Sequence, residues 1–170
     1  LVERHPIFCQ GGEKQMDGRG QFEQYCRDNG LDISVLELDE STRTAQLAAE
    51  AIGTELGSIV KSLVFLADGK PALVLVAGDR RADTKKLAQV LKAKKVKIAD
   101  ADTVRAETGF VIGGVPPVGH LTPLPTLIDQ SLGRFETVYA AAGAPNAVFP
   151  IAYDLLFQIT AGQVADVTED

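Results

Sequence analysis

The stretch 58–77 reads SIVKSLVFLADGKPALVLVA, and it decides the fold class of this chain. Residues 58–67 are rich in β-branched and aromatic side chains, and residues 72–77 form a second apolar run. The dipeptide Asp68-Gly69 between them is typical of the two-residue turn of a β-hairpin. The stretch therefore predicts a hairpin, and at least part of the sheet is expected to be antiparallel.

The rest of the chain predicts a mixture of strands and short helices around this hairpin. Further strands are expected over 33–38, 96–98, 124–128, 137–141 and 146–149. Helices are expected over 21–29, from Ser41 or Thr42 to 52, over 84–92, from Asp100 or Asp102 to 109, and over 151–160 with Pro150 at its start. Strands and helices do not alternate regularly, so the pattern favours an α+β sheet or partial barrel over a doubly wound parallel sheet.

Composition indicates one globular domain. The 170 residues are 45% hydrophobic and 24% charged, and no apolar run approaches the roughly 20 residues that a membrane span requires. The net charge of −6 argues against broad electrostatic capture of nucleic acid. Two cysteines are too few for a disulfide framework, so a reducing compartment, the cytoplasm, is expected.

The first fifteen residues, LVERHPIFCQGGEKQ, lack the features of a signal peptide. The only methionine in the chain follows them, at Met16. We therefore expect residues 1–15 to be an N-terminal extension that is non-native or disordered, and residues 16–170 to form a single domain.

Residues 109–119, GFVIGGVPPVG, form a segment that we call the Gly-Pro loop. Four glycines and two prolines disfavour a helix or a central strand. The segment is either a rigid turn between strands or a shaped loop that presents backbone N–H and C=O groups at a pocket. His120 follows the loop and either lines the same pocket or is solvated or bonded to backbone.

Lys61 is a charged residue within a largely apolar strand, and the strand pattern does not explain its presence there. Period-two alternation places it among apolar residues, and the opposite face of the same strand is apolar too. An ammonium buried there without a partner would cost several kcal/mol or lose its proton. Either Lys61 lies at an edge and reaches solvent, or it lies at a pocket floor opposite the Gly-Pro loop, which is our hypothesis.

Two further candidates for a functional role are a group of lysines and an aspartate. Residues 85–97 hold six of the seventeen basic residues, either as a solvated helix face or as a phosphate-contacting patch. Asp129 follows an expected strand and is either a helix N-cap or a pocket carboxylate. The sequence lacks a GxSxG motif, a P-loop and a paired-histidine metal signature, so no metal or cofactor is expected.

Four ordered motifs resemble the YbaK family, relatives of the editing domain inserted in bacterial prolyl-tRNA synthetases. They are IVKSL at 59–63, DTKKLA at 83–88, TGF at 108–110 followed by GGVPPVG at 113–119, and LID at 127–129. The resemblance covers about 42–167. It implies a mixed, largely antiparallel curved sheet or partial barrel flanked by short helices, and the activity of a free-standing aminoacyl-tRNA deacylase.

The resemblance also implies a site. Lys61 corresponds to the family's strand lysine, and Gly113 through Pro117 correspond to its GxxxP loop. Lys61, Gly113 and Gly114 are thereby the expected catalytic residues. The residues expected to bind substrate are Val115, Pro116, Pro117 and Asp129 of these motifs, together with His120, which is a candidate because it follows the loop. Backbone groups of the loop would hold the terminal adenosine and the ester carbonyl, while Lys61 would orient the substrate or offset negative charge.

The implied substrate is a mischarged tRNA, expected to be a tRNA for proline carrying cysteine, alanine or another small amino acid, and the implied partner is its acceptor end. Alanine-specific members carry a histidine in the late strand region, where this chain reads YAAAGAPN at 139–146, so the aminoacyl group stays open. Recruitment by a synthetase and the oligomeric state stay open as well. The alternative is a non-catalytic module on the same fold that binds nucleic acid or a small ligand.

Overall fold

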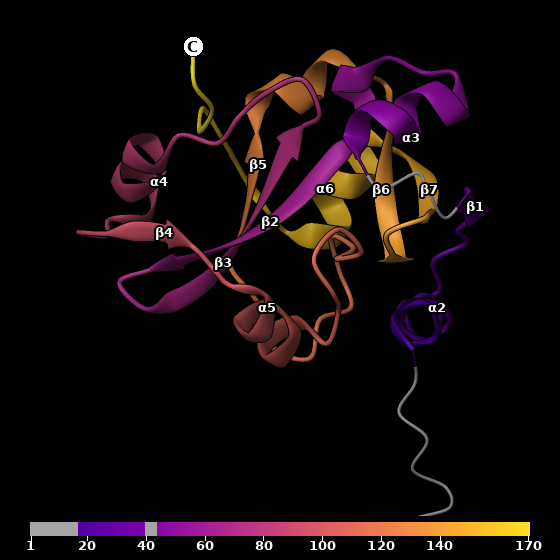
Figure 1. Cartoon of the computed structure of the whole chain (residues 1–170), viewed down its shortest axis with the longest axis horizontal. Helices are drawn as coiled ribbons and strands as arrows, with labels where there is room; N and C mark the ends of the chain where they lie inside the picture. The colour runs from indigo at the N-terminus through magenta and orange to yellow at the C-terminus, as the bar shows by residue number, and fades with distance from the viewer. Residues whose placement is uncertain (1–16, 40–43) are drawn as a thin grey trace, which may run out of the picture.

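The computed structural model describes residues 17–39 and 44–170. Within these ranges the chain forms a three-stranded and a five-stranded sheet, with short helices around them (Figure 1). The helices are α2 (Gly18–Asp28), α3 (Ala45–Ile52), α4 (Thr84–Leu91), α5 (Ala101–Thr108) and α6 (Tyr153–Thr160), with 3-10 turns η1 (Leu56–Ser58) and η2 (Gln130–Arg134). The strands are β1 (Leu36–Glu37), β2 (Val60–Ala67), β3 (Lys70–Ala77), β4 (Val96–Ile98), β5 (Thr126–Asp129), β6 (Thr137–Ala144), β7 (Ala147–Ala152) and β8 (Gln163–Ala165).

One sheet is antiparallel and the other is mixed, so the β-structure is largely antiparallel, which confirms the expected fold class. The smaller sheet has the order β1-β7-β6 and is antiparallel throughout. The larger has the order β4-β2-β3-β5-β8, in which only the β3–β5 and β5–β8 pairs are parallel. A parallel bridge between Ile59 and Tyr139 joins the sheets at the start of β2. Neither sheet closes into a barrel within the described ranges.

The hairpin forms as the sequence predicts. Strands β2 and β3 pair without a register shift from Val60 opposite Ala77 to Ala67 opposite Lys70. Asp68 and Gly69 have φ angles of 50° and 83°, the left-handed conformation that a type I′ turn needs at both central positions. The Asp68 carboxylate also accepts the backbone N–H groups of Lys94 and Lys95, which fastens the tip of the hairpin to the segment before β4.

Strand β3 lies at the centre of the core. Its residues from Leu73 to Ala77 have no exposed surface. Leu73 and Leu75 belong to the larger apolar cluster, whereas Val74 and Val76 belong to a second cluster that includes Leu87 of α4. A strand covered on both faces needs apolar residues at consecutive positions, which explains the uninterrupted run of this strand.

Polar caps set the limits of two predicted helices. Asp83 and Asp100 accept backbone N–H groups in the first turns of α4 and α5, and Gly109 ends α5 with a φ of 83°. Thr44 caps α3, whereas the cap candidates Ser41 and Thr42 lie outside the described residues.

The prediction of a helix over 151–160 beginning at Pro150 was wrong at its start. Pro150 and Ile151 lie in β7, opposite Tyr139 and Val138 of β6. On its other side β7 pairs with β1 only at Ala147 and Val148, so Pro150 lies where the ladder needs no N–H donor. The helix begins at Tyr153 instead.

Two strands also differ from the expectation. The strand expected over 33–38 is only two residues long, at Leu36–Glu37. The three-residue β8 was not predicted, because so short a segment carries little periodicity and its pairing with β5 is long-range.

Helix α2 packs on the smaller sheet through two glycines. A Cβ at Gly18 would collide with the carbonyl oxygen of Gly143, and a Cβ at Gly143 with that of Gly18. Gly143 has a φ of 102° and lies within a register shift of the β6–β7 ladder, between Ala141 and Ala144. Phe22 of the same helix stacks on Phe149 with ring centroids 4.9 Å apart. The close approach therefore buries the apolar face of α2 against the core.

No helix within residues 17–39 and 44–170 is long and apolar enough to cross a membrane.

Candidate active site

A cavity of about 260 Å³ opens beside the first half of β2. Its walls come from the start of α3, residues 59–64, the end of β4, α5, the Gly-Pro loop and facing parts of β6 and β7. Most side chains in these walls are apolar, and among the described residues that line it Lys61 is the only charged one. The cavity therefore suits a small uncharged group that lies next to one cation.

Lys61 lies in β2 and is only partly exposed. Its Nζ donates a hydrogen bond to the backbone carbonyl of Arg80, in the loop that follows β3. Burial lowers the pKa of the Lys61 ammonium, the positive charge of Arg81 lowers it further, and the carboxylate of Asp79 opposes both. The amine is thus held by a backbone carbonyl, with one cation, Arg81, and one carboxylate, Asp79, close enough to act on its charge.

One edge of β2 faces the cavity without a strand beside it. Strand β4 pairs with β2 at Phe65–Ala67, and its last backbone contact is from the Ala99 N–H to the Val64 carbonyl at 2.9 Å. Because backbone groups of an antiparallel strand alternate between its two edges, the N–H and C=O of Ser62 point to the same side as those of Val64. Ser62 Oγ is also buried, and it has no hydrogen-bond partner within the described part of the chain. This edge offers polar backbone groups within an apolar wall.

The Gly-Pro loop closes the cavity opposite β2. Gly113 has a φ of 89°, and it lines the cavity together with Val115. Gly114 packs against the backbone of β6, where a Cβ would lie 2.8 Å from Ala144 Cα. Both glycines are needed by the geometry, the first for its conformation and the second for close approach.

The structure brings Lys61, Gly113 and Val115 to one cavity. Gly114, Pro116 and Pro117 are buried behind its wall and support the loop from inside. His120 does not line the cavity: its Nε2 lies 2.7 Å from the Pro116 carbonyl and its ring meets Phe110 edge-on. Burial lowers the pKa of His120. His120 was expected either to line the pocket or to be solvated or bonded to backbone. In the structure it is bonded to backbone.

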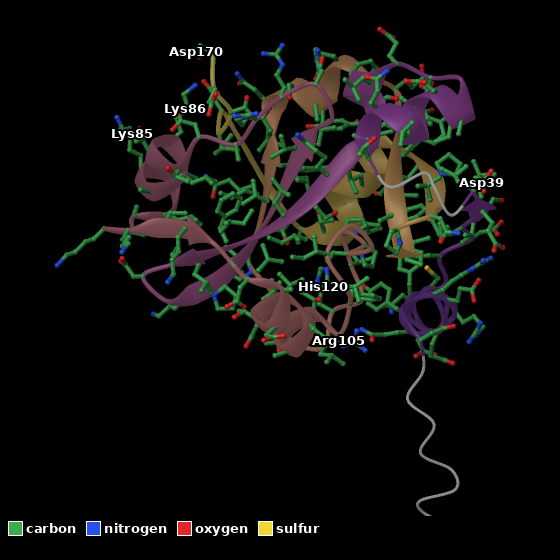
Figure 2. The ribbon with its side chains drawn as sticks, viewed as in Figure 1. Asp39, Lys85, Lys86, Arg105, His120 and Asp170 are labelled. Carbon is green, nitrogen blue, oxygen red and sulfur yellow. The ribbon has the colours of Figure 1, made fainter. Side chains whose placement is uncertain are left out.

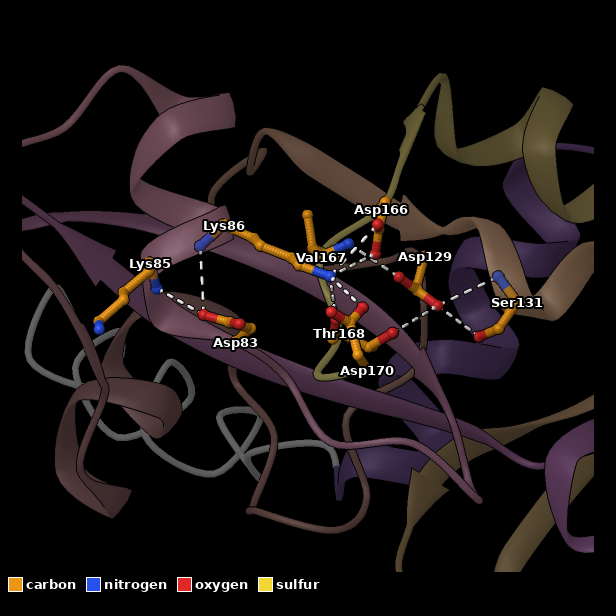
Figure 3. Close-up of polar contacts among 9 residues, drawn as sticks. All are labelled: Asp83, Lys85, Lys86, Asp129, Ser131, Asp166, Val167, Thr168 and Asp170. Atoms are coloured by element: carbon orange, nitrogen blue, oxygen red, sulfur yellow. Dashed lines mark hydrogen bonds and ion pairs between the residues drawn. The ribbon is translucent and has the colours of Figure 1, made fainter.

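Asp129 also lies away from the Lys61 cavity. Its carboxylate has no exposed surface and accepts hydrogen bonds from the backbone and the hydroxyl of Ser131, from the Val167 N–H and from the Thr168 hydroxyl (Figure 3). It caps η2 and fastens the last residues of the chain to β5. Of the two roles expected for Asp129, N-cap or pocket carboxylate, the structure shows the N-cap. The same carboxylate also accepts hydrogen bonds from Val167 and Thr168.

Four charged residues near Lys61 were missed by sequence reasoning. Asp79, Arg80 and Arg81 follow β3, and Arg134 ends η2. The Arg134 guanidinium binds both carboxylate oxygens of Asp79, at 3.0 and 2.8 Å. The available signal was the charged run DRRAD at 79–83, which follows the apolar run 72–77 after a single glycine.

The lysines over residues 85–97 do not act as one group. Figure 2 shows Lys85 and Lys86 on α4, next to Asp170. Lys86 Nζ is held by Asp166, Asp170 and the Thr168 carbonyl, whereas the other five lysines are exposed. Within the described ranges, no group of three or more His, Cys, Asp or Glu side chains is arranged to hold a metal ion.

Comparison with known proteins places this chain in a family. Residues 39–159 match the family described as the aminoacyl-tRNA editing domain. The chain is 35% identical over 154 residues to YwhH, an uncharacterized protein of Bacillus subtilis, covering 89% of this chain and 95% of YwhH. It is 29% identical over 130 residues to EbsC of Enterococcus faecalis, named as a candidate Cys-tRNA(Pro)/Cys-tRNA(Cys) deacylase, covering 76% and 79% of the two chains.

A solved structure shares the whole fold. The crystal structure of a candidate trans-editing enzyme for prolyl tRNA synthetase superposes with a TM-score of 0.87 and 40% sequence identity. The superposition covers 92% of this chain and 100% of that one.

Proposed function

Because the chain belongs to the family of aminoacyl-tRNA editing domains, we propose that it is a trans-editing hydrolase that deacylates mischarged aminoacyl-tRNA. The observation that carries the proposal is the cavity in which Lys61 faces Gly113 and Val115 of the Gly-Pro loop. The name of EbsC and the function given for the related crystal structure support a tRNA for proline as substrate.

The proposed reaction is hydrolysis of the ester that joins the amino acid to the terminal ribose. Water adds to the carbonyl carbon, the bond to the ribose oxygen breaks, and that oxygen leaves with a proton. An aminoacyl ester is activated enough to need no protein nucleophile. Lys61 offsets the negative charge that develops on the carbonyl oxygen, and Gly113 and Gly114 shape the backbone that holds the acceptor end.

The lining of the cavity supports an uncharged aminoacyl group. A volume of about 260 Å³ with mostly apolar walls holds a side chain such as that of alanine or cysteine without a charged partner. Such a pocket discriminates by size, at about 1–3 kcal/mol per methylene.

The partners and the compartment follow from this reaction. The five exposed lysines of residues 85–97 are candidates to contact tRNA phosphates, and a prolyl-tRNA synthetase is a candidate second partner. We expect the protein to act in the cytoplasm, where mischarged tRNA is produced.

Single-turnover deacylation tests the proposal. The panel is tRNA for proline charged with alanine, cysteine, serine or threonine, together with correctly charged prolyl-tRNA. Wild type is expected to deacylate at least one mischarged species and to spare prolyl-tRNA. Lys61→Ala is expected to lower that rate by about 10²- to 10³-fold, in the range measured for loss of a group that stabilises an oxyanion.

Lys70→Ala is the matched control, because Lys70 is an exposed lysine on the paired strand β3 and lies outside the cavity. It should retain the wild-type rate. If folded wild-type protein deacylates none of the panel, the hydrolase is the wrong proposal for these substrates. Tight, salt-sensitive binding of uncharged tRNA that is unaffected by Lys61→Ala would then favour the binding module.

A further inference from the structure

The last five residues of the chain, 166–170, form a segment that we call the strap. It runs antiparallel beside residues 81–83, with a bridge between Ala82 and Thr168. The Asp83 N–H donates to the Val167 carbonyl and the Glu169 N–H to the Arg81 carbonyl, each at 2.8 Å. The strap is thus the neighbour that orders the loop between β3 and α4.

Two charged groups fasten the strap from opposite sides (Figure 3). Lys86 Nζ, on α4, lies 3.2 Å from the Asp166 carboxylate, 3.0 Å from that of Asp170 and 2.7 Å from the Thr168 carbonyl. The buried Asp129 carboxylate accepts the Val167 N–H at 2.9 Å and the Thr168 hydroxyl at 3.3 Å. Val167 has no exposed surface and Thr168 only 4%, so the middle of the strap is part of the core.

The loop that the strap orders is the one that holds Lys61. Its Arg80 carbonyl accepts the Lys61 ammonium, one residue before the Arg81 carbonyl that accepts the strap. At the other end of the same loop, Asp79 is bound by Arg134. The Arg80 carbonyl therefore lies between the Asp79–Arg134 ion pair and the hydrogen bond from the strap to Arg81. A displacement of the strap can shift this carbonyl, because only one peptide unit separates the two.

We propose that the strap is a positioning element for Lys61, in which Lys86 and Thr168 set the place of the Arg80 carbonyl and thereby of the Lys61 ammonium. This inference rests on the proposed function for its effect on catalysis. Neither Lys86 nor Thr168 lines the Lys61 cavity, so both act through the loop. A displacement of about 1 Å in a positioned group can lower a catalytic rate by about 10²-fold.

Two pairs of variants test the inference. Lys86→Met removes the three contacts of Lys86, and Lys85→Met is its control, because Lys85 is an exposed neighbour on the same helix. Thr168→Val removes the hydroxyl that donates to Asp129, and Thr168→Ser retains it. The saturating single-turnover rate should fall about 10- to 100-fold in Lys86→Met and Thr168→Val. It should stay within about twofold of wild type in the two controls.

A second readout follows Lys61 itself. The rate of acetylation at Lys61, measured by mass spectrometry across pH, gives the midpoint at which its amine loses the proton. Release of the loop moves the amine into solvent and away from Arg81, so the midpoint should rise in Lys86→Met and Thr168→Val and stay constant in the controls. This readout does not need the deacylase activity, so it tests the strap even if the proposed substrate is wrong.

The outcomes separate the two claims. An unchanged midpoint in folded Lys86→Met and Thr168→Val overturns the positioning role, whether or not the rate falls, because the strap would then act by another route. A raised midpoint in a protein without deacylase activity supports the strap and rejects the proposed function. If Thr168→Val does not fold, the surface variant Lys86→Met decides.

Discussion

The ammonium of Lys61 donates its hydrogen bond to the carbonyl of Arg80, 19 residues further along the chain. A carbonyl oxygen satisfies one of the three N–H donors of a lysine and carries no charge to neutralise it. Arg81 adds a second positive charge nearby and the Asp79 carboxylate offsets part of it, so the arrangement favours a ligand that is negative or becomes negative during reaction.

The rate of deacylation should fall at alkaline pH. Burial and the charge of Arg81 lower the Lys61 pKa from its ordinary value of 10.5, and only the protonated amine can offset an oxyanion. As pH rises through this lowered pKa, the rate should fall, after subtraction of base-catalysed hydrolysis. Lys61→Arg keeps its charge throughout and should lose the decrease. An alkaline decrease of the same size in Lys61→Arg would contradict the role given to Lys61.

Comparison of Gly113→Ala with Gly69→Ala should distinguish an effect of backbone strain on stability from an effect on catalysis. Gly113 and Gly69 have φ angles of 89° and 83°, and a Cβ would meet no close neighbour at either position. Each alanine should therefore lower the free energy of unfolding by about 1–2 kcal/mol, measured by urea denaturation. Only Gly113→Ala should also lower the deacylation rate, because Gly69 lies at the hairpin turn. Equal deacylation rates in Gly113→Ala and Gly69→Ala would show that the Gly-Pro loop is not part of the active site.

Ala141→Leu should reduce the range of substrates. Ala141 of β6 lines the cavity, and a leucine there fills part of the space for the aminoacyl side chain. The rate should fall more for threonine than for alanine esters, in single-turnover assays with the same tRNA. Ala51→Leu, on the exposed side of α3, is the control and should leave the ratio unchanged. An unchanged ratio in Ala141→Leu would mean that the aminoacyl group binds elsewhere.

Asp129→Asn should destabilise the protein strongly. The fully buried carboxylate accepts from four donors, and an amide opposes at least one of them with its own N–H groups. The expected loss in the free energy of unfolding is about 2 kcal/mol or more, measured by urea denaturation. Asp100→Asn is the control: this exposed cap of α5 can be replaced by asparagine, itself a good N-cap, with little change. A loss in Asp129→Asn no larger than in the control would show that the carboxylate is dispensable.

Local chemistry made part of the fold predictable. The Asp68-Gly69 turn and the caps at Asp83 and Asp100 involve neighbours in sequence, so the hairpin, α4 and α5 form as predicted. Pro150 was misread because its ring suits both a helix start and a strand position without a partner, and only the short pairing of β1 decides between them.

The candidate site was predictable only in part, because long-range contacts assemble it. The anomaly of a lysine in an apolar strand indicated Lys61, and the composition of the Gly-Pro loop indicated Gly113. That Asp129 holds a residue 38 positions away, or that Arg134 binds Asp79 across 55 positions, leaves no local pattern in the sequence. The Asp129 carboxylate is engaged by Val167 and Thr168 and not by the cavity.

The contact between Gly18 and Gly143 has a consequence for how this chain can diverge. Each glycine leaves room for the backbone of the other, so a side chain gained at one position is tolerated only if α2 first withdraws from β6. The matched family region begins at residue 39, after this helix. Among descendants of this sequence, the two glycines should therefore be inherited together where the helix is kept and drift independently where it is lost.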